Sequence, residues 1–254
     1  MAFPEVTRGI YEPAALCSLQ AIVFDTFGTL VDWRSSLINE LSAFGRRRGI
    51  AADWRLLVDE WRAAYYPSMD RVRKGEQPWT TLDALHRQSL ERLTLNLGVE
   101  GLGPDDLDEL TRAWHRLRPW PDVPGGLQRL ATRYILGPLS NANVSLLVRL
   151  RKFNGFAWDV VLGADLWQHF KPDPETYRGA CRLLSLHPAE VMLVAAHNDD
   201  LRAARAEGLR TGFIPRPAEY GPRQAKDFAA NEAWTVVAAD LQDVATLLGV
   251  PAAP

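Results

Sequence analysis

Cysteine is scarce in this chain of 254 residues, which contains only Cys17 and Cys181. The two cysteines have no C-x-x-C spacing and no neighbouring metal-ligand residues, so the sequence argues against a disulfide framework and a zinc site. No window approaches about 18 uninterrupted apolar residues, and the sequence therefore predicts no transmembrane helix. The N-terminal stretch also lacks the basic segment and apolar core of a secretory signal, so we expect a cytoplasmic protein.

A large excess of charge of either sign is also missing. The formal net charge is −2, and the contents of 47% hydrophobic and 24% charged residues are ordinary for a globular protein. No overall field favours nucleic acid or an acidic membrane surface, and we expect neither as a partner. The densest basic cluster, residues 46–48, precedes Gly49 and suits the C-terminal end of a helix dipole.

Apolar runs of strand length recur along the chain and alternate with helical patterns in its second half. Unbroken apolar strands that alternate with helices are typical of a parallel sheet covered on both faces. The sequence therefore predicts an α/β fold with a doubly wound parallel sheet. The predicted strands are 21–24, 134–139, 159–162, 191–196, 211–215 and 234–238, and the predicted helices between the later strands are 126–133, 144–153, 174–184 and 201–207.

The connection after the first strand is much longer than the others. A crossover needs only about a dozen residues and one helix, whereas this one has helical periodicity over residues 35–48, 56–66, 80–97 and 105–117. We therefore expect an inserted helical cap at residues 33–118 and a core formed by residues 1–32 and 119–254. A cap at this position would close over the carboxyl edge of the sheet and exclude water.

The first predicted strand ends on the carboxylate of Asp25, followed by Phe27, Gly28 and Thr29. A carboxylate at the carboxyl end of a parallel strand lies where open α/β sheets bind ligands, and it can act as a covalent nucleophile. Cleavage of a phosphate ester in this way usually needs a nearby acid to protonate the alkoxide. Because Phe27 stands in the place of that acid, the leaving group should need no proton, and halide is such a group. Taken alone, the pattern is equally compatible with a strand that merely ends on an aspartate.

Polar segments follow three further predicted strands. Ser140 and Asn141 precede a helix, where they could bind an anion or simply cap the helix. Lys171 precedes a proline, which keeps it out of helical geometry; it could hold a carboxylate ionised, although a surface lysine is the simpler interpretation. Asp200 opens the helix after the strand at 191–196. Each segment is a weak signal, but their order along the chain is specific.

With these motifs the chain resembles the haloacid dehalogenase superfamily, and within it the L-2-haloacid dehalogenases of type II, from about residue 19 to residue 248. The resemblance implies a Rossmann-like core with a helical cap and no cofactor or metal. It implies that Asp25 attacks C2 of a short 2-haloacid, expels halide and forms an aspartyl ester, which water hydrolyses to a 2-hydroxy acid of inverted configuration. The implied partners are the haloacid and the halide ion, and assembly as a homodimer is left open.

The resemblance also assigns roles to individual residues. Lys171 and Thr29 would hold Asp25, and Asp200 would help the hydrolytic water. Arg62 would hold the halide from the cap, because a guanidinium stays charged and donates several N–H bonds; the alternative is a surface arginine. The remaining residues assigned to substrate or halide binding are Thr26, Phe27, Ser140, Asn141, Tyr177, His197 and Asn198.

The segment 195–199 departs from the family pattern. The family has two serines, an asparagine and a tryptophan before the aspartate, whereas this chain has Ala195, Ala196, His197, Asn198 and Asp199. Asn198 could replace the family's amide, His197 could donate to the leaving halide, or the water could be activated differently. Donors at a developing anion lower a reaction barrier, so fluoroacetate is among the substrates we consider.

Two other functions remain open. A magnesium-dependent phosphatase of the same superfamily would need an acid at the position of Phe27 and a second carboxylate near Ala195 and Ala196, because Mg²⁺ prefers oxygen ligands. A phosphoacceptor module that uses Asp25 as a switch would not need the predicted cap or the pair of Lys171 and Ser140.

Overall fold

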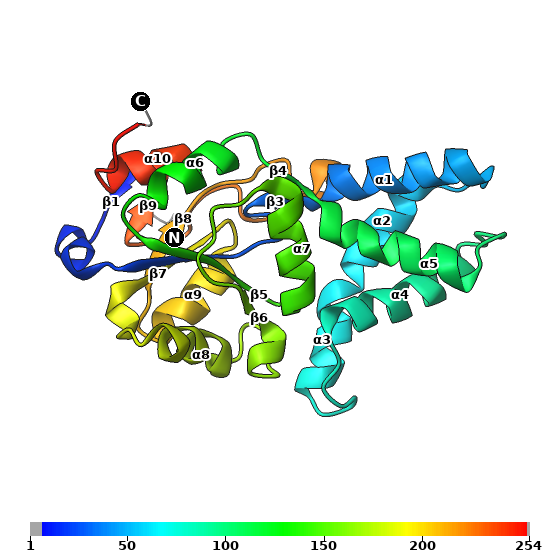
Figure 1. Ribbon diagram of the computed structural model, residues 1–254, viewed down its shortest axis with the longest axis horizontal. Coiled ribbons are helices and arrows are strands. Elements are labelled where there is room, and N and C mark those ends of the chain that lie inside the picture. The colour runs from blue at the N-terminus through cyan, green and yellow to red at the C-terminus, as the bar shows by residue number, and fades with distance from the viewer. Residues whose placement is uncertain (1–6, 253–254) are drawn as a thin grey trace.

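The computed structural model describes residues 7–252 and contains a seven-stranded sheet (Figure 1). The neighbouring strands from β9 to β6 pair in parallel, and β1 pairs with β9 in the antiparallel sense. In spatial order the strands are β1 (Gly9–Ile10), β9 (Val236–Val237), β8 (Arg210–Phe213), β7 (Val191–Ala195), β2 (Ala21–Phe24), β5 (Ile135–Ser140) and β6 (Leu162–Gly163). The strand β2 therefore lies inside the sheet, between β7 and β5.

Helices cover both faces of this sheet. Alternate residues of β2 point to opposite faces: Ile22 and Phe24 belong to one buried cluster, and Ala21 and Val23 to the other. The first cluster includes residues of α6 (Val123–Leu130), α7 (Val144–Asn154) and α10 (Leu241–Leu247), and the second includes residues of α8 (Pro174–Leu184) and α9 (Asn198–Ala206). This arrangement confirms the predicted doubly wound α/β fold.

A second group of helices lies beside the sheet, to the right in Figure 1. It consists of α1 (Trp33–Arg48), α2 (Trp54–Ala63), α3 (Tyr65–Arg73), α4 (Leu82–Asn96), α5 (Pro104–Thr111) and the 3-10 turn η2 (Arg112–Arg116). The chain enters and leaves this group through an antiparallel pair, β3 (Val31–Asp32) and β4 (Arg118–Pro119). A further link joins the group to α7, because Asn143 Nδ2 donates to Asp83 Oδ2 at 2.9 Å and Asp83 N donates to Asn143 Oδ1 at 3.2 Å.

Local signals explain where the helices of this group begin and end. The side chain of Asp32 accepts a bond from Ser35 N and caps α1, which ends at Gly49 with a φ of 67°. The side chain of Asp53 caps α2 in the same way by accepting from Leu56 N. The sequence predicted one helix over 56–66, but the structure divides it at Ala64 into α2 and α3, so the side chains of Tyr65 and Tyr66 belong to a new helix.

The other differences from the predicted elements are mostly at their ends. The predicted strand 159–162 is paired only at Leu162 and Gly163, because the Asp159 side chain and backbone take the N–H and C=O of Leu136 before the ladder begins. The predicted helix 105–117 is α5 followed by η2. The sequence analysis did not predict β1 or α10, both of which are very short or near the C-terminal end.

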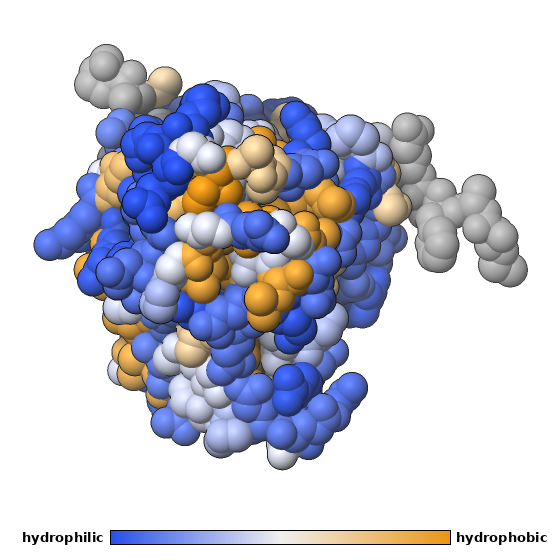
Figure 2. All heavy atoms as spheres, turned by 90° about the vertical axis from the view of Figure 1, so that its right-hand side faces the viewer, coloured by the Kyte–Doolittle hydropathy of each residue, from blue (hydrophilic) through white to orange (hydrophobic). Residues whose placement is uncertain are grey.

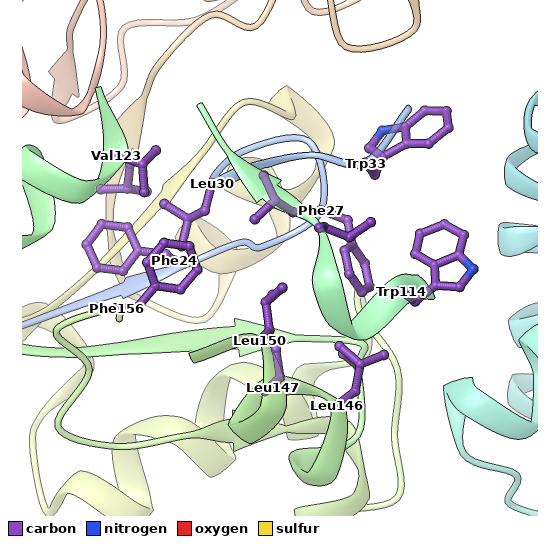
Figure 3. Close-up of a cluster of buried hydrophobic side chains, with 14 of the residues drawn as sticks. Phe24, Phe27, Leu30, Trp33, Trp114, Val123, Leu146, Leu147, Leu150 and Phe156 are labelled. Atoms are coloured by element: carbon purple, nitrogen blue, oxygen red, sulfur yellow. The ribbon is translucent and has the colours of Figure 1, made fainter. Parts of the chain in front are cut away.

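The buried core continues from the sheet into the helical group. Figure 3 shows Phe24 and Leu30 packed among residues of α7 and Phe156, with Phe27 reaching toward Trp114. Figure 2 views the end of the molecule formed by the helical group, where apolar surface lies among hydrophilic residues. Within residues 7–252, no helix has the length and apolar character required to span a bilayer.

Candidate active site

Asp25 directly follows β2, and three different side chains contact its carboxylate. The Thr29 hydroxyl donates to Oδ2 at 2.7 Å, His197 Nδ1 lies 3.1 Å from the same oxygen, and Lys171 Nζ donates to Oδ1 at 3.4 Å. Burial by itself raises the pKa of Asp25, but Lys171, His197 and Thr29 outweigh it and lower the pKa well below its ordinary value. Asp25 is therefore an ionised carboxylate at neutral pH.

Lys171 lies between two carboxylates. Its Nζ is 2.6 Å from Asp200 Oδ2, and the Tyr177 hydroxyl donates to Asp200 Oδ1 at 2.7 Å. Burial lowers the pKa of Lys171, but the charges of Asp200 and Asp25 outweigh it and raise the pKa, so the ammonium is retained. The backbone N–H of Lys171 donates to Asn141 Oδ1 at 2.7 Å, which ties this loop to the end of β5.

His197 joins Asp25 to a second buried carboxylate, Glu219. The imidazole Nε2 lies 2.8 Å from Glu219 Oε2, and the indole of Trp33 donates to Glu219 Oε1 at 3.0 Å. Burial lowers the pKa of His197, but Glu219 and Asp25 raise it well above the ordinary value. The sequence analysis missed Glu219, because it lies in an irregular segment after β8 whose proline and glycine residues indicate only a turn.

Arg62 of α2 is a second buried cation. Only 5% of the residue is exposed, and its Nε and Nη1 have no hydrogen-bond partner within residues 7–252. Its guanidinium carbon lies 4.3 Å from the centre of the Tyr65 ring and 5.1 Å from that of Trp33. Its remaining nitrogen, Nη2, lies 3.4 Å from the hydroxyl of Tyr220. Such a group offers a permanent positive charge and free N–H donors to an anion.

A single cavity of about 380 Å³ brings together eight of the predicted site residues. These are Asp25, Phe27, Arg62, Asn141, Lys171, Tyr177, His197 and Asp200. The structure adds Tyr65 and Tyr66 from α3 to this lining, and charged residues at its edge, namely Asp70, Arg73, Asp199 and Lys226. The Phe27 ring packs edge-on against Trp114, at a centroid distance of 5.3 Å (Figure 3). It also packs edge-on against Tyr65, at 6.3 Å.

Three predicted substrate-binding residues do not line the cavity. Thr26 is fully buried, and its Oγ1 has no hydrogen-bond partner within residues 7–252. Ser140 is also buried, and its hydroxyl accepts a bond from Ala142 N at 3.2 Å. For both residues, contact with a substrate stays a prediction.

The amide of Asn198 is bonded within the protein. Its Nδ2 donates to Asp227 Oδ1 at 2.8 Å and to the carbonyl of Ala229 at 3.1 Å. Its Oδ1 accepts from Asn231 N and from the indole of Trp234. These bonds hold residues 227–234 in place, and contact of Asn198 with a substrate stays a prediction.

The chain matches the family model of haloacid dehalogenase-like hydrolases over residues 19–208. Among curated proteins it is 31% identical to the (S)-2-haloacid dehalogenase of Xanthobacter autotrophicus over 78% of this chain and 76% of that protein. It is 29% identical to (S)-2-haloacid dehalogenase 4A of Burkholderia cepacia, over 90% of this chain and 99% of that protein.

Solved structures agree with these sequence matches. The L-2-haloacid dehalogenase PA0810 superposes with a TM-score of 0.89 at 52% identity, over 92% of this chain and all of the other. The defluorinating L-2-haloacid dehalogenase Rha0230 superposes with a TM-score of 0.89 at 45% identity, over 91% of this chain and 95% of the other. These matches confirm the resemblance expected from the motifs, and the chain belongs to the haloacid dehalogenase-like hydrolases.

Proposed function

We propose that the protein hydrolyses the carbon–halogen bond of short (S)-2-haloacids through an aspartyl ester on Asp25. The observation that carries this proposal is the ionised Asp25 carboxylate in a small cavity that also contains Phe27 and N–H groups of Arg62 that are unpaired among residues 7–252. Halide displacement requires a nucleophile and a site for the departing anion. It needs no acid beside the nucleophile, because halide leaves without a proton. The relatives described above are named as 2-haloacid dehalogenases, which supports this proposal.

In the first step Asp25 attacks C2 of the substrate. Oδ2 is held by Thr29 and His197, whereas Oδ1 has a single contact of 3.4 Å to Lys171, so Oδ1 is the oxygen with freedom to attack. The new O–C2 bond forms as the carbon–halogen bond breaks, and the electron pair leaves with the halide. The N–H groups of Arg62 would stabilise the developing negative charge.

In the second step water hydrolyses the ester. Esterification removes the negative charge of Asp25, which is one of the two carboxylates that raise the pKa of His197. His197 can then release its Nδ1 proton and act as a base toward water. The hydroxide bonds to Cγ of Asp25, the bond from Cγ to the substrate oxygen breaks, and the 2-hydroxy acid leaves with a proton from His197. The proton that remains on the Asp25 carboxyl group then passes to His197, which restores the ionised carboxylate and the imidazolium. One proton and one halide ion are released per turnover.

We include fluoroacetate among the proposed substrates. The carbon–fluorine bond is the strongest of the carbon–halogen bonds, so its cleavage depends most on donors placed at the leaving anion. Two buried nitrogens of Arg62 have no partner in the part of the chain that the structure describes, and Asn141 and His197 line the same cavity. Support also comes from the 45% identity to a relative described as defluorinating.

We further propose that residues 33–118 act as a cap on the core formed by residues 1–32 and 119–254. The helices α2 and α3 contribute Arg62, Tyr65 and Tyr66 to the cavity. By contrast, Asp25 follows β2 and Lys171 precedes α8, and both elements lie outside residues 33–118. Closing the cavity from both sides excludes water from the nucleophile until the ester has formed.

The site does not fit the magnesium ion of the phosphatase alternative. Both oxygens of Asp25 face cationic or donor groups, since Lys171 approaches Oδ1 while Thr29 and His197 approach Oδ2. Within residues 7–252, no three His, Cys, Asp or Glu side chains are grouped to hold a metal ion. The ammonium of Lys171 already neutralises Asp25 and Asp200, with Nζ at 3.4 and 2.6 Å from their carboxylates.

The test is halide release from chloroacetate, 2-chloropropionate and fluoroacetate in excess EDTA, beside cleavage of p-nitrophenyl phosphate with Mg²⁺. We expect halide release that EDTA does not reduce. A single turnover in ¹⁸O water should place the label in Asp25 before it reaches the product. Phosphatase activity without halide release would overturn the proposal, and label found only in the product would mean that water attacks C2 directly.

A further inference from the structure

Glu219 is almost completely buried although it is charged, and the loop after β2 is shaped to accommodate it. Only 1% of the residue is exposed. Gly28 has a φ of 90°, and a Cβ atom at that position would collide with the Glu219 carboxylate. A carboxylate costs several kcal/mol to bury unless it is paired and hydrogen-bonded. The contacts that compensate this cost should therefore indicate the role of Glu219.

Glu219 contacts two residues that line the cavity, His197 and Arg62. One carboxylate oxygen, Oε2, lies 2.8 Å from His197 Nε2. The other, Oε1, accepts a bond from the Trp33 indole at 3.0 Å and lies 3.6 Å from Arg62 Nη2. His197 contacts the nucleophile, whereas Arg62 is the cation that we assign to the halide. Glu219 itself does not line the cavity.

We propose that Glu219 is a positioning residue that serves both half-reactions, by orienting His197 for ester hydrolysis and by limiting the affinity of Arg62 for halide. This inference rests on the proposed function and deepens it. No contact with the substrate is required, because Glu219 acts through the two residues that it holds.

The effect on His197 follows from its two ring nitrogens. A carboxylate at Nε2 keeps the proton on that nitrogen and fixes the plane of the ring. Once the ester has formed, Nδ1 is then the nitrogen that can accept a proton from water, and it already points at Asp25. Without Glu219 the ring could rotate or adopt the other tautomer, and hydrolysis of the ester would slow down.

The effect on Arg62 follows from charge. A halide bound at the free Nε or Nη1 of Arg62 would be repelled by the negative charge of Glu219, whose Oε1 lies 3.6 Å from Nη2 of the same guanidinium. The geometry thus combines strong N–H donors with a counter-charge that weakens the hold on the product. Removing that counter-charge should strengthen halide binding and increase product inhibition.

The test is the substitution Glu219→Gln, which keeps the size of the side chain and an acceptor for Trp33. In single turnovers with 2-chloropropionate, halide release should remain, whereas the ester on Asp25, detected by mass spectrometry, should persist about a hundredfold longer. Inhibition by added chloride should strengthen by about fivefold or more, because the repulsion is removed. Glu232→Gln, which removes a surface carboxylate bonded to Arg202 and Arg205, is the matched control and should change neither quantity.

The outcomes separate this inference from the proposed function. If the wild-type protein forms no ester on Asp25, the proposed function is wrong. If the wild type forms the ester but Glu219→Gln leaves its lifetime and the chloride inhibition unchanged, only the role of Glu219 is wrong. A uniform loss of both half-reactions in proportion to a loss of folded protein, measured by thermal unfolding, would also overturn the inference and reduce Glu219 to a structural residue.

Discussion

Replacing Lys171 by methionine tests the electrostatic basis of the site. Lys171 is 7% exposed, and its Nζ lies 3.4 Å from Asp25 and 2.6 Å from Asp200. At an effective dielectric constant of about 20, an ion pair at the longer distance is worth about 5 kcal/mol. Because about 1.4 kcal/mol corresponds to one pH unit, we expect the acid limb of kcat/KM to move up by about three and a half pH units. Activity at neutral pH should also fall, because Asp25 and Asp200 then share the cavity without the ammonium that neutralises them.

The same substitution should destabilise the fold in a pH-dependent way. Removing one partner of a buried ion pair costs about 3–5 kcal/mol. The lowered pKa of Asp25 stabilises the wild type above the unfolded pKa of about 4, and this contribution is lost as the pH falls through the lowered value. The difference between the wild type and Lys171→Met should therefore be largest at neutral pH and should shrink below pH ~4.

Chloride release from chloroacetate over a range of pH, together with urea unfolding at each pH, measures both effects. The control is Lys152→Met, which removes an exposed lysine at the end of α7 and should leave the pH profile unchanged. The reasoning is refuted if Lys171→Met keeps the acid limb of the wild type, or if its stability deficit is the same at every pH.

The remaining predictions concern the nucleophile, His197 and Gly28. Asp25→Asn should abolish halide release, because losing a covalent nucleophile removes the reaction path; steady turnover by freshly purified Asp25→Asn would contradict this. His197→Asn should slow turnover of fluoroacetate and of chloroacetate alike, because both form the same ester and His197 acts on its hydrolysis; a larger loss of fluoride release than of chloride release would show that His197 also takes part in fluoride departure. The pKa of His197 is raised in the folded state, so the stability that it contributes is complete below about pH 6.5 and declines as the pH rises through the raised value; a gap in melting temperature to His197→Asn that widens from pH 6.5 to 9 would have the wrong sign. Gly28→Ala should cost at least about 1–3 kcal/mol of stability through its positive φ, plus the collision with Glu219; Gly249→Ala, with a φ of 70° and open space around it, should show the backbone cost alone.

Most of the site could be predicted because its residues follow strands. Asp25 and Asn141 come directly after β2 and β5, and a parallel sheet brings the carboxyl ends of its strands to one edge. Lys171 and Asp200 lie on segments whose proline and acidic residues show that a helix begins there. Local pattern and sheet topology together therefore predict that these segments meet at one edge, whereas the roles of single side chains came from the family resemblance.

Glu219 and Asn198 show where this reasoning ends. The contacts of Glu219 depend on the path of an irregular segment, which no periodicity describes. Asn198 stands in a predicted site segment, but its amide bonds to residues 227–234, whose position also has no sequence pattern. The division of the predicted helix 56–66 at Ala64 is different, because Pro67 in the first turn of α3 has no N–H to continue the helical ladder to Ala63, and the sequence analysis overlooked this signal.

The charged residues at the edge of the cavity bear on how a substrate anion arrives. Arg73 lies 2.9 Å from Asp70 and 2.7 Å from Asp173, and Lys226 lies 3.2 Å from Asp199. Each positive group at the entrance is thus matched by a carboxylate, and the entrance has no excess of positive charge to draw anions from a distance. Electrostatic steering accelerates association strongly only where one sign dominates, and it then declines as salt is added. Capture of a haloacid by this protein should accordingly proceed at nearly the same rate in dilute buffer and at physiological ionic strength, with discrimination in favour of anions beginning only inside the cavity.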